Sequence, residues 1–258
     1  MNPKAETLRT LHRPTLAIPN AWDVASARIF ERAGFPALAT TSAGVAFSLG
    51  YPDVQRISRA EMIQVVARIA RAVKIPVTAD VEAGYDDPVQ TARDVWAAGA
   101  VGMNLEDTLG DGELLDNAAR VRAIRAAVPE MVINARTDLL WLKAGDESTR
   151  VDRAIGLLNS YLEAGADCVF APGVRDRETI GRLVKGVRGP LNVLGSTGSP
   201  SIAEMKSLGV ARVSVGSGPM RAAMGLTDRI ARELHDQGTY ESMLAGAIPY
   251  ADANRLLS

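Results

Sequence analysis

Short apolar runs alternate with longer stretches of helical periodicity along most of this chain. In the clearest stretch, Ile63, Val66, Ala70 and Val73 fall on one stripe at a period of 3.6 residues. Helices are predicted over Glu61–Val73, Ala118–Val128 and Arg150–Ala164. The apolar runs are short enough to be buried strands. Eight strands are predicted, at Leu16–Ile18, Ala37–Ala39, Pro76–Ala79, Val101–Met103, Met131–Asn134, Cys168–Phe170, Leu191–Leu194 and Arg212–Val215.

Four of these strands follow a helical pattern that ends in a small or apolar residue plus glycine. The pairs are Ala33-Gly34, Ala98-Gly99, Ala164-Gly165 and Leu208-Gly209. Glycine after the last turn adopts a left-handed conformation that ends a helix, so a strand can follow quickly. Strand and helix alternating eight times over roughly 250 residues predict an α/β fold of the (β/α)8 type, the TIM barrel.

A doubly wound open sheet is the alternative architecture. That fold usually has a glycine-rich, phosphate-binding turn after its first strand. The chain has Pro-Asn-Ala-Trp-Asp at residues 19–23 instead. No linker or low-complexity segment divides the chain, so residues 1–258 are predicted to be one barrel domain. A helical extension is expected from about residue 239, with Ile248–Leu257 available to pack on a partner subunit.

Composition narrows the class of protein further. The chain has 258 residues, 47% of them hydrophobic, which is enough for one large core. A net charge of −1 and a pI of about 6.2 argue against nucleic acid as a partner. The sequence has no apolar run long enough for a membrane span and no signal-like N-terminus. Cys168 is the single cysteine, so a cytoplasmic enzyme without a disulfide framework is expected.

Charged side chains follow the apolar part of three consecutive strands. Asp80 and Glu82 end one strand, Glu106 ends the next, and Arg136 ends the third. Because strand side chains alternate between two faces, these polar residues share one face and their apolar neighbours the other. Helices cover the outside of a barrel, so the polar set is predicted to point inward near its C-terminal mouth. Asn20, Ser42, Asn192 and Ser214 fall at matching places in other strands.

The predicted cluster consists of oxygen ligands and one guanidinium, without His or Cys. Carboxylates alone favour Mg²⁺ or Mn²⁺ over zinc. Because Mg²⁺ keeps several waters, one direct and two water-bridged carboxylates would suffice, and Asp80, Glu82 and Glu106 are the candidates. Asp107 and Asp138 have the wrong parity or lie past the strand, so we expect capping or supporting roles for them.

At these residues the chain resembles the isocitrate lyase and phosphoenolpyruvate mutase superfamily. The resemblance runs from about Leu16 to about Arg221. It is carried by Thr-Thr-Ser-Ala-Gly-Val at 40–45, Gly-Tyr-Pro-Asp at 50–53, Ala-Asp-Val-Glu-Ala-Gly-Tyr at 79–85, Asn-Leu-Glu-Asp at 104–107, Ala-Arg-Thr-Asp at 135–138, Asn-Val-Leu at 192–194 and Val-Ser-Val-Gly at 213–216.

The resemblance implies a TIM barrel that commonly forms tetramers, with the last helix exchanged between subunits. It implies Mg²⁺ at Asp80, assisted through water by Glu82 and Glu106, and a 2-oxo acid that chelates the metal. The substrate carboxylate would be held by backbone N–H groups around Ser42, Ala43 and Gly44 and by Arg136. Asn192 is expected at the substrate as well. Asp53 matches a position near the reacting centre, although a turn residue after Pro52 is the alternative.

The loop after the fourth of these strands departs from the family pattern. Lyases of the superfamily carry a Lys-Lys-Cys-Gly-His type motif there, whose Cys acts as acid or base, and mutases and hydrolases use a Lys. Here residues 107–115 read Asp-Thr-Leu-Gly-Asp-Gly-Glu-Leu-Leu. Asp111 and Glu113 are possible replacement acids, but a solvated loop face is favoured for both. Cys168 lies among apolar neighbours and is expected in the core.

The favoured hypothesis is a carbon–carbon lyase or decarboxylase that depends on Mg²⁺ or Mn²⁺. It would act on a small 2-oxo or 2-hydroxy dicarboxylic acid through an enolpyruvate-like intermediate, with Asp53, Glu106 and Arg136 as catalytic residues. A P–C bond enzyme like phosphonopyruvate hydrolase or the mutase is the first alternative. A non-catalytic 2-oxo acid binder is the second. The expected assembly is a homo-oligomer, a dimer or a tetramer.

Overall fold

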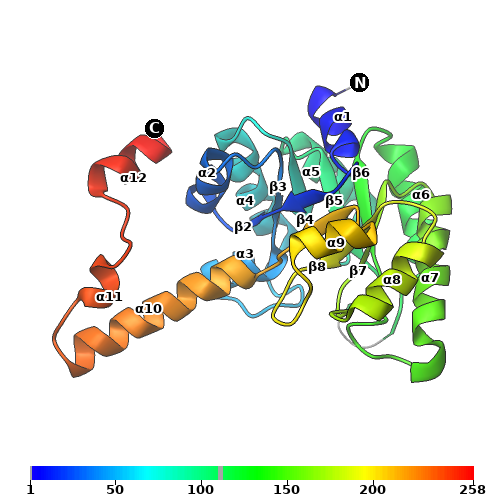
Figure 1. Cartoon of the computed structure of the whole chain (residues 1–258). Coiled ribbons are helices and arrows are strands. Elements are labelled where there is room, and N and C mark those ends of the chain that lie inside the picture. Colours follow the sequence, from blue (N-terminus) through cyan, green and yellow to red (C-terminus); the bar gives the residue numbers. More distant parts are fainter. Residues whose placement is uncertain (1, 110–112) are drawn as a thin grey trace.

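The computed structural model describes residues 2–109 and 113–258 and forms a barrel of parallel strands surrounded by helices (Figure 1). The strand order is β1-β9-β8-β7-β6-β5-β4-β3-β2, and every pair of neighbours is parallel. The predicted (β/α)8 class is therefore confirmed. The strands are β1 Leu16–Ile18, β2 Asn20–Ala21, β3 Leu38–Thr40, β4 Val77–Asp80, β5 Gly102–Glu106, β6 Val132–Arg136, β7 Cys168–Ala171, β8 Leu191–Leu194 and β9 Arg212–Ser214.

The ninth strand arises because proline interrupts the first one. Pro19 has no N–H to donate, so the run splits into β1, which pairs with β9, and β2, which pairs with β3. The Pro19 carbonyl still accepts a hydrogen bond from the Ala39 N–H at 2.9 Å. The chain from β1 to β2 thus joins the two ends of the sheet, and the eight predicted strand positions close the barrel.

Most helices begin at a side-chain cap that the sequence supplies. Ser58 and Glu61 form a capping box, so α4 begins at Arg59, two residues before its predicted start. The helices are α1 Pro3–Thr10, α2 Val24–Arg32, α3 Ser42–Ser48, α4 Arg59–Ala72, α5 Pro88–Ala97, α6 Asn117–Ala127, α7 Glu147–Glu163, α8 Arg177–Gly186, α9 Ile202–Leu208, α10 Gly218–Asp236, α11 Glu241–Leu244 and α12 Tyr250–Leu257.

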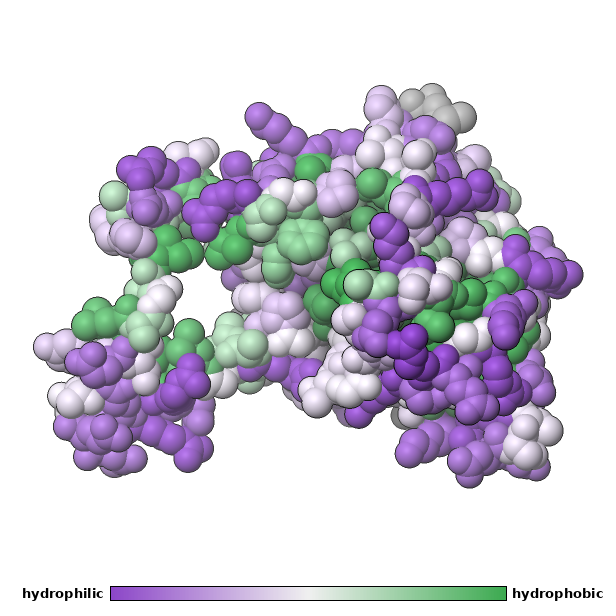
Figure 2. Space-filling model, viewed as in Figure 1, coloured by the Kyte–Doolittle hydropathy of each residue, from purple (hydrophilic) through white to green (hydrophobic). Residues whose placement is uncertain are grey.

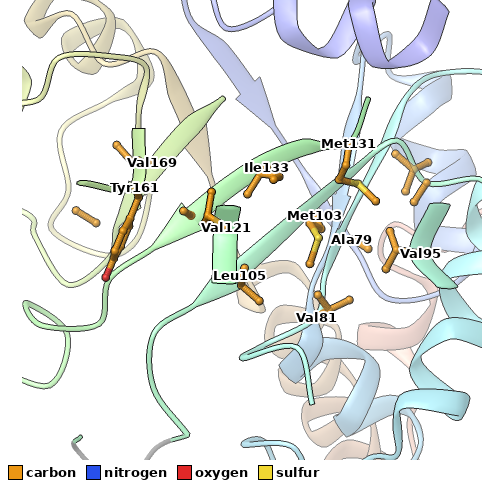
Figure 3. Close-up of a cluster of buried hydrophobic side chains, with 14 of the residues drawn as sticks. Ala79, Val81, Val95, Met103, Leu105, Val121, Met131, Ile133, Tyr161 and Val169 are labelled. Atoms are coloured by element: carbon orange, nitrogen blue, oxygen red, sulfur yellow. The ribbon is translucent and has the colours of Figure 1, made fainter. Parts of the chain in front are cut away.

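The main hydrophobic core lies between the outer face of the barrel and the helices. Figure 3 shows Met103, Leu105 and Ile133 of the strands beside Val95 and Val121 of the helices. A second, smaller cluster closes the N-terminal end of the barrel, where α1 packs over the strands. Since apolar side chains fill the outer layer and this end, the polar inward positions are left to the C-terminal mouth.

The C-terminal helices leave the barrel as an arm, defined here as residues 218–258. In Figure 1, α10 projects away from the barrel, and α11 and α12 turn back until α12 contacts α2. Apolar side chains of the arm stay exposed, among them Leu234, Leu244 and Tyr250. Figure 2 shows apolar surface around the opening between arm and barrel. Within the described residues, no helix combines the length and the hydropathy that crossing a membrane would require.

Candidate active site

A cavity of about 130 Å³ opens at the C-terminal ends of the strands and reaches into the barrel. Its lining includes residues of every strand from β2 to β9 and none of β1. Eight of the predicted site residues or inward positions line it: Asn20, Ser42, Ala43, Asp53, Asp80, Arg136, Asn192 and Ser214. The polar mouth predicted from strand parity therefore exists as one continuous cavity.

Asp80, at the end of β4, is held in this cavity by neutral donors. One carboxylate oxygen accepts hydrogen bonds from the Ser42 N–H at 3.0 Å and the Ser42 hydroxyl at 2.8 Å. The other accepts from the Asn104 amide at 2.9 Å, and Asn134 in turn donates to Asn104 at 3.0 Å. The Asp80 N–H donates to the Thr40 hydroxyl. These contacts fix the carboxylate without neutralising its charge.

Arg136, at the end of β6, lies in the same cavity between two carboxylates. Its Nη1 is 2.8 Å from Glu106, and its Nε donates to Asp138 at 2.6 Å. The guanidinium also lies over the Phe170 ring, 5.7 Å from its centre. Burial works against the charge, but Glu106 and Asp138 outweigh it and raise the pKa of Arg136. The side chain is therefore a permanent cation with a fixed orientation.

A hydrogen-bonded chain behind Arg136 reaches the outer helices. Asp107 accepts from the Asp138 N–H at 2.8 Å and from the Tyr161 hydroxyl of α7 at 2.7 Å. Both aspartates are almost fully buried. Neither lines the cavity, so the supporting roles predicted for Asp107 and Asp138 agree with their positions.

Glu82 and Glu106 lie next to the cavity but do not line it. Burial, and then repulsion from Asp80, raise the pKa of Glu82 to about 7. Burial also raises the pKa of Glu106, although Arg136 opposes the shift. Across the described residues, no three His, Cys, Asp or Glu side chains converge closely enough to hold a metal ion. Of the three carboxylates predicted to hold a metal, Asp80 alone lines the cavity.

Left-handed backbone conformations cluster where Glu82 meets the loop after α3. Glu82 has a φ of 53°, Gln55 one of 50°, Tyr85 one of 58°, and the β-branched Val54 one of 73°. The Gln55 N–H donates to Glu82, and the Tyr85 N–H donates to the Gln55 side chain at 3.1 Å. Such conformations persist only when the surroundings enforce them, and they concentrate at functional sites. The contact holds the loop that carries Asp53 against β4.

The turn at residues 42–44 is the start of the short helix α3. The Ser42 N–H is directed to Asp80, while the Gly44 N–H donates to its own cap, Thr41, at 3.3 Å. Ala43 lines the cavity, but Gly44 does not. A side chain at Gly44 would meet Thr41 at 2.5 Å and Trp22 at 3.3 Å, so close packing explains the glycine.

The cavity lining also includes residues to which the sequence patterns assigned no role, among them Trp141, Phe170, Pro172 and Arg212. Arg212 shares the inward parity of Ser214, two residues later on β9, and this parity could have identified it. Trp141 lies beyond β6 on a segment whose path no pattern predicts. Glu113 of the loop after β5 is exposed, and Asp111 lies outside the described residues.

The residues present fit a hard divalent cation. Every candidate donor is an oxygen, as Mg²⁺ prefers. One oxygen of Glu82, Oε1, is buried without a hydrogen-bond partner in the described structure, and a metal-bound water would supply one. The donor set around Asp80 thus supports the predicted choice of Mg²⁺ or Mn²⁺.

The fold and the site together define a (β/α)8 barrel with a polar cavity at the C-terminal mouth, where enzymes of this fold carry their active sites. Residues 8–235 match the model of the phosphoenolpyruvate phosphomutase family. The chain belongs to this family, and the predicted membership of the isocitrate lyase and phosphoenolpyruvate mutase superfamily is confirmed. The expectation of an enzyme of this superfamily is confirmed with it.

Relatives at moderate identity cover nearly the whole chain. An uncharacterised protein of Mycobacterium tuberculosis is 37% identical over 240 residues, which are 91% of this chain and 89% of the relative. An oxaloacetate decarboxylase of Rhodopseudomonas palustris is 30% identical over 247 residues, 88% of this chain and 82% of its own length.

Solved structures share the fold over the same extent. A candidate lyase/mutase from Burkholderia cenocepacia is 38% identical, with a TM-score of 0.89 over 98% of this chain and 94% of that one. A phosphonopyruvate hydrolase in complex with oxalate and Mg²⁺ has a TM-score of 0.85 at 24% identity, over 98% of this chain and 94% of its own, a likeness in fold alone.

Proposed function

We propose that the protein is a Mg²⁺-dependent lyase or decarboxylase acting on a small 2-oxo or 2-hydroxy dicarboxylic acid. The observation that carries the proposal is a single cavity lined by both Asp80, an unneutralised carboxylate, and Arg136, a permanent cation. A 2-oxo acid that chelates a metal ion needs a carboxylate to hold the metal and, beside it, a cation to bind the carboxylate of the acid.

The chain's own residues would bind and orient the substrate. Asp80 would hold the metal, with Glu82 and Glu106 reaching it through water. Arg136 would bind the substrate carboxylate beside the Ser42–Ala43 turn, with its orientation fixed by Asp138. When bound, Mg²⁺ supplies positive charge where the enolate oxygen develops. Arg136 adds a second positive charge, which also favours the enolpyruvate-like product of C–C bond cleavage.

Asp53 is the side chain best placed to move a proton. It lines the cavity from the loop after α3. Desolvation raises the pKa of Asp53, and Asp80 contributes to the shift. A carboxyl group that titrates above its usual range is suited to acid–base work. We assign it the transfer that the missing Lys-Lys-Cys-Gly-His loop performs in other lyases.

The named relative supports this reading over the alternatives. The Rhodopseudomonas palustris protein is named oxaloacetate decarboxylase, and oxaloacetate belongs to the class of substrate proposed here. The loop after β5 has no lysine or arginine between residues 107 and 116, so a phosphoryl group would find no cation there.

A turnover screen tests the proposal. Oxaloacetate, 2-methylisocitrate, alkylmalates and phosphonopyruvate would each be incubated with the protein, with Mg²⁺ and with EDTA. We expect Mg²⁺-dependent release of pyruvate or another 2-oxo acid from a dicarboxylate. Phosphate release from phosphonopyruvate alone would favour the P–C bond alternative. Binding of oxalate without turnover of any compound would favour a non-catalytic binder.

A further inference from the structure

The floor of the cavity contains a buried cation that the proposed chemistry does not use. Arg212, the first residue of β9, lines the cavity and is only 2% exposed. Its Nε and Nη1 have no hydrogen-bond partner among the described residues. An isolated buried charge is costly, and proteins pair nearly all of them. A partner that is not part of the chain would remove this cost.

The charges of the cavity leave Arg212 without a direct ion pair, although Asp80 attracts it through space. Arg136 already takes Glu106 and Asp138 as its partners, and Asp80 is held by Ser42 and Asn104. No carboxylate of the described chain lies within ion-pair distance of Arg212. Its other ionisable neighbours are His12 and Cys168. Both are buried groups that carry no negative charge near neutral pH.

A second free donor lies beside the guanidinium. Asn192 of β8 is the register partner of Arg212 and lines the same cavity. Its Oδ1 accepts from the Ser214 hydroxyl at 3.3 Å, while its Nδ2 is buried without a partner in the described structure. Adjacent strands thus place a guanidinium edge and an amide N–H beside the same cavity, and together they form a donor set for a planar carboxylate.

We propose that Arg212 and Asn192 form a carboxylate site on the cavity floor. If the function proposed above holds, as this inference requires, the site receives the second carboxylate of the dicarboxylic substrate. The first stays at the Arg136 mouth. The lining connects mouth and floor without interruption by the chain, and the loop after β5 offers no Lys or Arg for a second carboxylate. Arg212 is then a specificity residue that favours dicarboxylic over monocarboxylic 2-oxo acids.

The site itself is tested without metal or turnover. The thermal midpoint of the full chain would be measured in EDTA while formate replaces gluconate, a bulkier carboxylate, at constant ionic strength. Formate at about ten times its Kd should raise the midpoint of the wild type by roughly 3 °C. Arg212→Met should abolish this shift, and Arg71→Met, at an exposed arginine of α4, should keep it. An equal shift in Arg212→Met, or none in the wild type, would overturn the site.

The assignment to the substrate is tested with Mg²⁺ present. Titration calorimetry would compare oxalate, which has no distal group, with malate. We expect Arg212→Met to weaken malate at least about ten-fold and oxalate by less than about two-fold. Malate binding that is unchanged in Arg212→Met would overturn the assignment, even where formate still depends on Arg212. Failure of the wild type to bind either acid would instead count against the proposed function, and the formate result would stand.

Discussion

At the scale of single residues, the site depends on how Asp80 is held rather than on a dense group of carboxylates. Of the three hydrogen bonds that its carboxylate accepts, two come from Ser42, one from the backbone N–H and one from the hydroxyl. Neutral donors orient a carboxylate and leave its charge for a cation, in the way that groups around a metal ligand usually do.

Ser42→Ala should therefore weaken Mg²⁺ binding by about ten-fold, because the hydroxyl that orients Asp80 is lost. Isothermal titration of Mg²⁺ in the presence of oxalate would measure the change. Ser48→Ala on the same helix is the control, since its hydroxyl is exposed and donates only to the Val45 carbonyl. Equal affinities in the two variants would contradict the orienting role.

His12 makes a second residue-scale prediction, on stability. It is 2% exposed, and burial followed by the nearby Arg212 lowers its pKa from 6.5 to about 4. Above pH 6.5 the imidazole is neutral in both the folded and the unfolded chain, so its lowered pKa costs no unfolding free energy there. As the pH falls toward 4, the unfolded chain gains a proton that the folded chain does not, and stability is lost.

The wild type should thus lose about 2 kcal/mol of unfolding free energy between pH 7 and pH 5 relative to His12→Gln, which cannot titrate. Urea unfolding at the two pH values would measure the difference between the proteins. An equal change in unfolding free energy with pH in the wild type and in His12→Gln would contradict the lowered pKa of His12.

At the scale of the elements, strand ends and the helices behind them act together. Tyr161 of α7 reaches Asp107 at the end of β5, and Asp107 supports the backbone N–H of Asp138, which fixes Arg136. The orientation of the guanidinium therefore depends on a helix that contributes nothing to the cavity lining.

Tyr161→Phe should lower kcat more than it changes KM, because Arg136 stays charged but is less well fixed. A hydrogen bond to a charged group contributes about 2 kcal/mol, so stability should fall by a similar amount. Steady-state kinetics and urea unfolding would test both. Tyr250→Phe, at a tyrosine that is 86% exposed, is the control, and kinetics identical to the wild type in both variants would rule out this support.

The strands and loops also show how much of the fold and of the site could be predicted from the sequence alone. Apolar runs located all eight strand positions, and strand parity placed Asp80 and Arg136 in one mouth. Parity applied one step further would have found Arg212. The meeting of Gln55 with Glu82 could not be predicted, because it depends on left-handed conformations of residues that rarely adopt them.

At the scale of the whole molecule, the arm is the feature that the barrel does not explain. Met224, Leu234, Met243, Leu244 and Leu257 are each more than 40% exposed along it. Apolar side chains gathered on one projecting segment usually mark an interface. We propose that the protein is a dimer or tetramer in which the arm packs on a neighbouring subunit.

Light scattering should accordingly give a mass of two or four times 27.4 kDa. Replacing Leu234 and Leu244 with Asp should shift the mass toward that of the monomer, because buried charges oppose association. Asp substitutions at the exposed Arg177 and Arg188 of the barrel are the control. A wild type that stays at 27.4 kDa would contradict the role of the arm.

The central claim is that Asp80 and Arg136 form a platform for a divalent cation and a 2-oxo acid. Calorimetric titration of oxalate with and without Mg²⁺ tests it most directly, in the wild type, in Asp80→Asn and in Asp152→Asn, a control at an exposed site on α7. We predict that Mg²⁺ tightens oxalate binding at least about 100-fold in the wild type and the control, and that Asp80→Asn removes this gain. An oxalate affinity that Mg²⁺ leaves unchanged, or a Mg²⁺-dependent gain that survives in Asp80→Asn, would contradict the account.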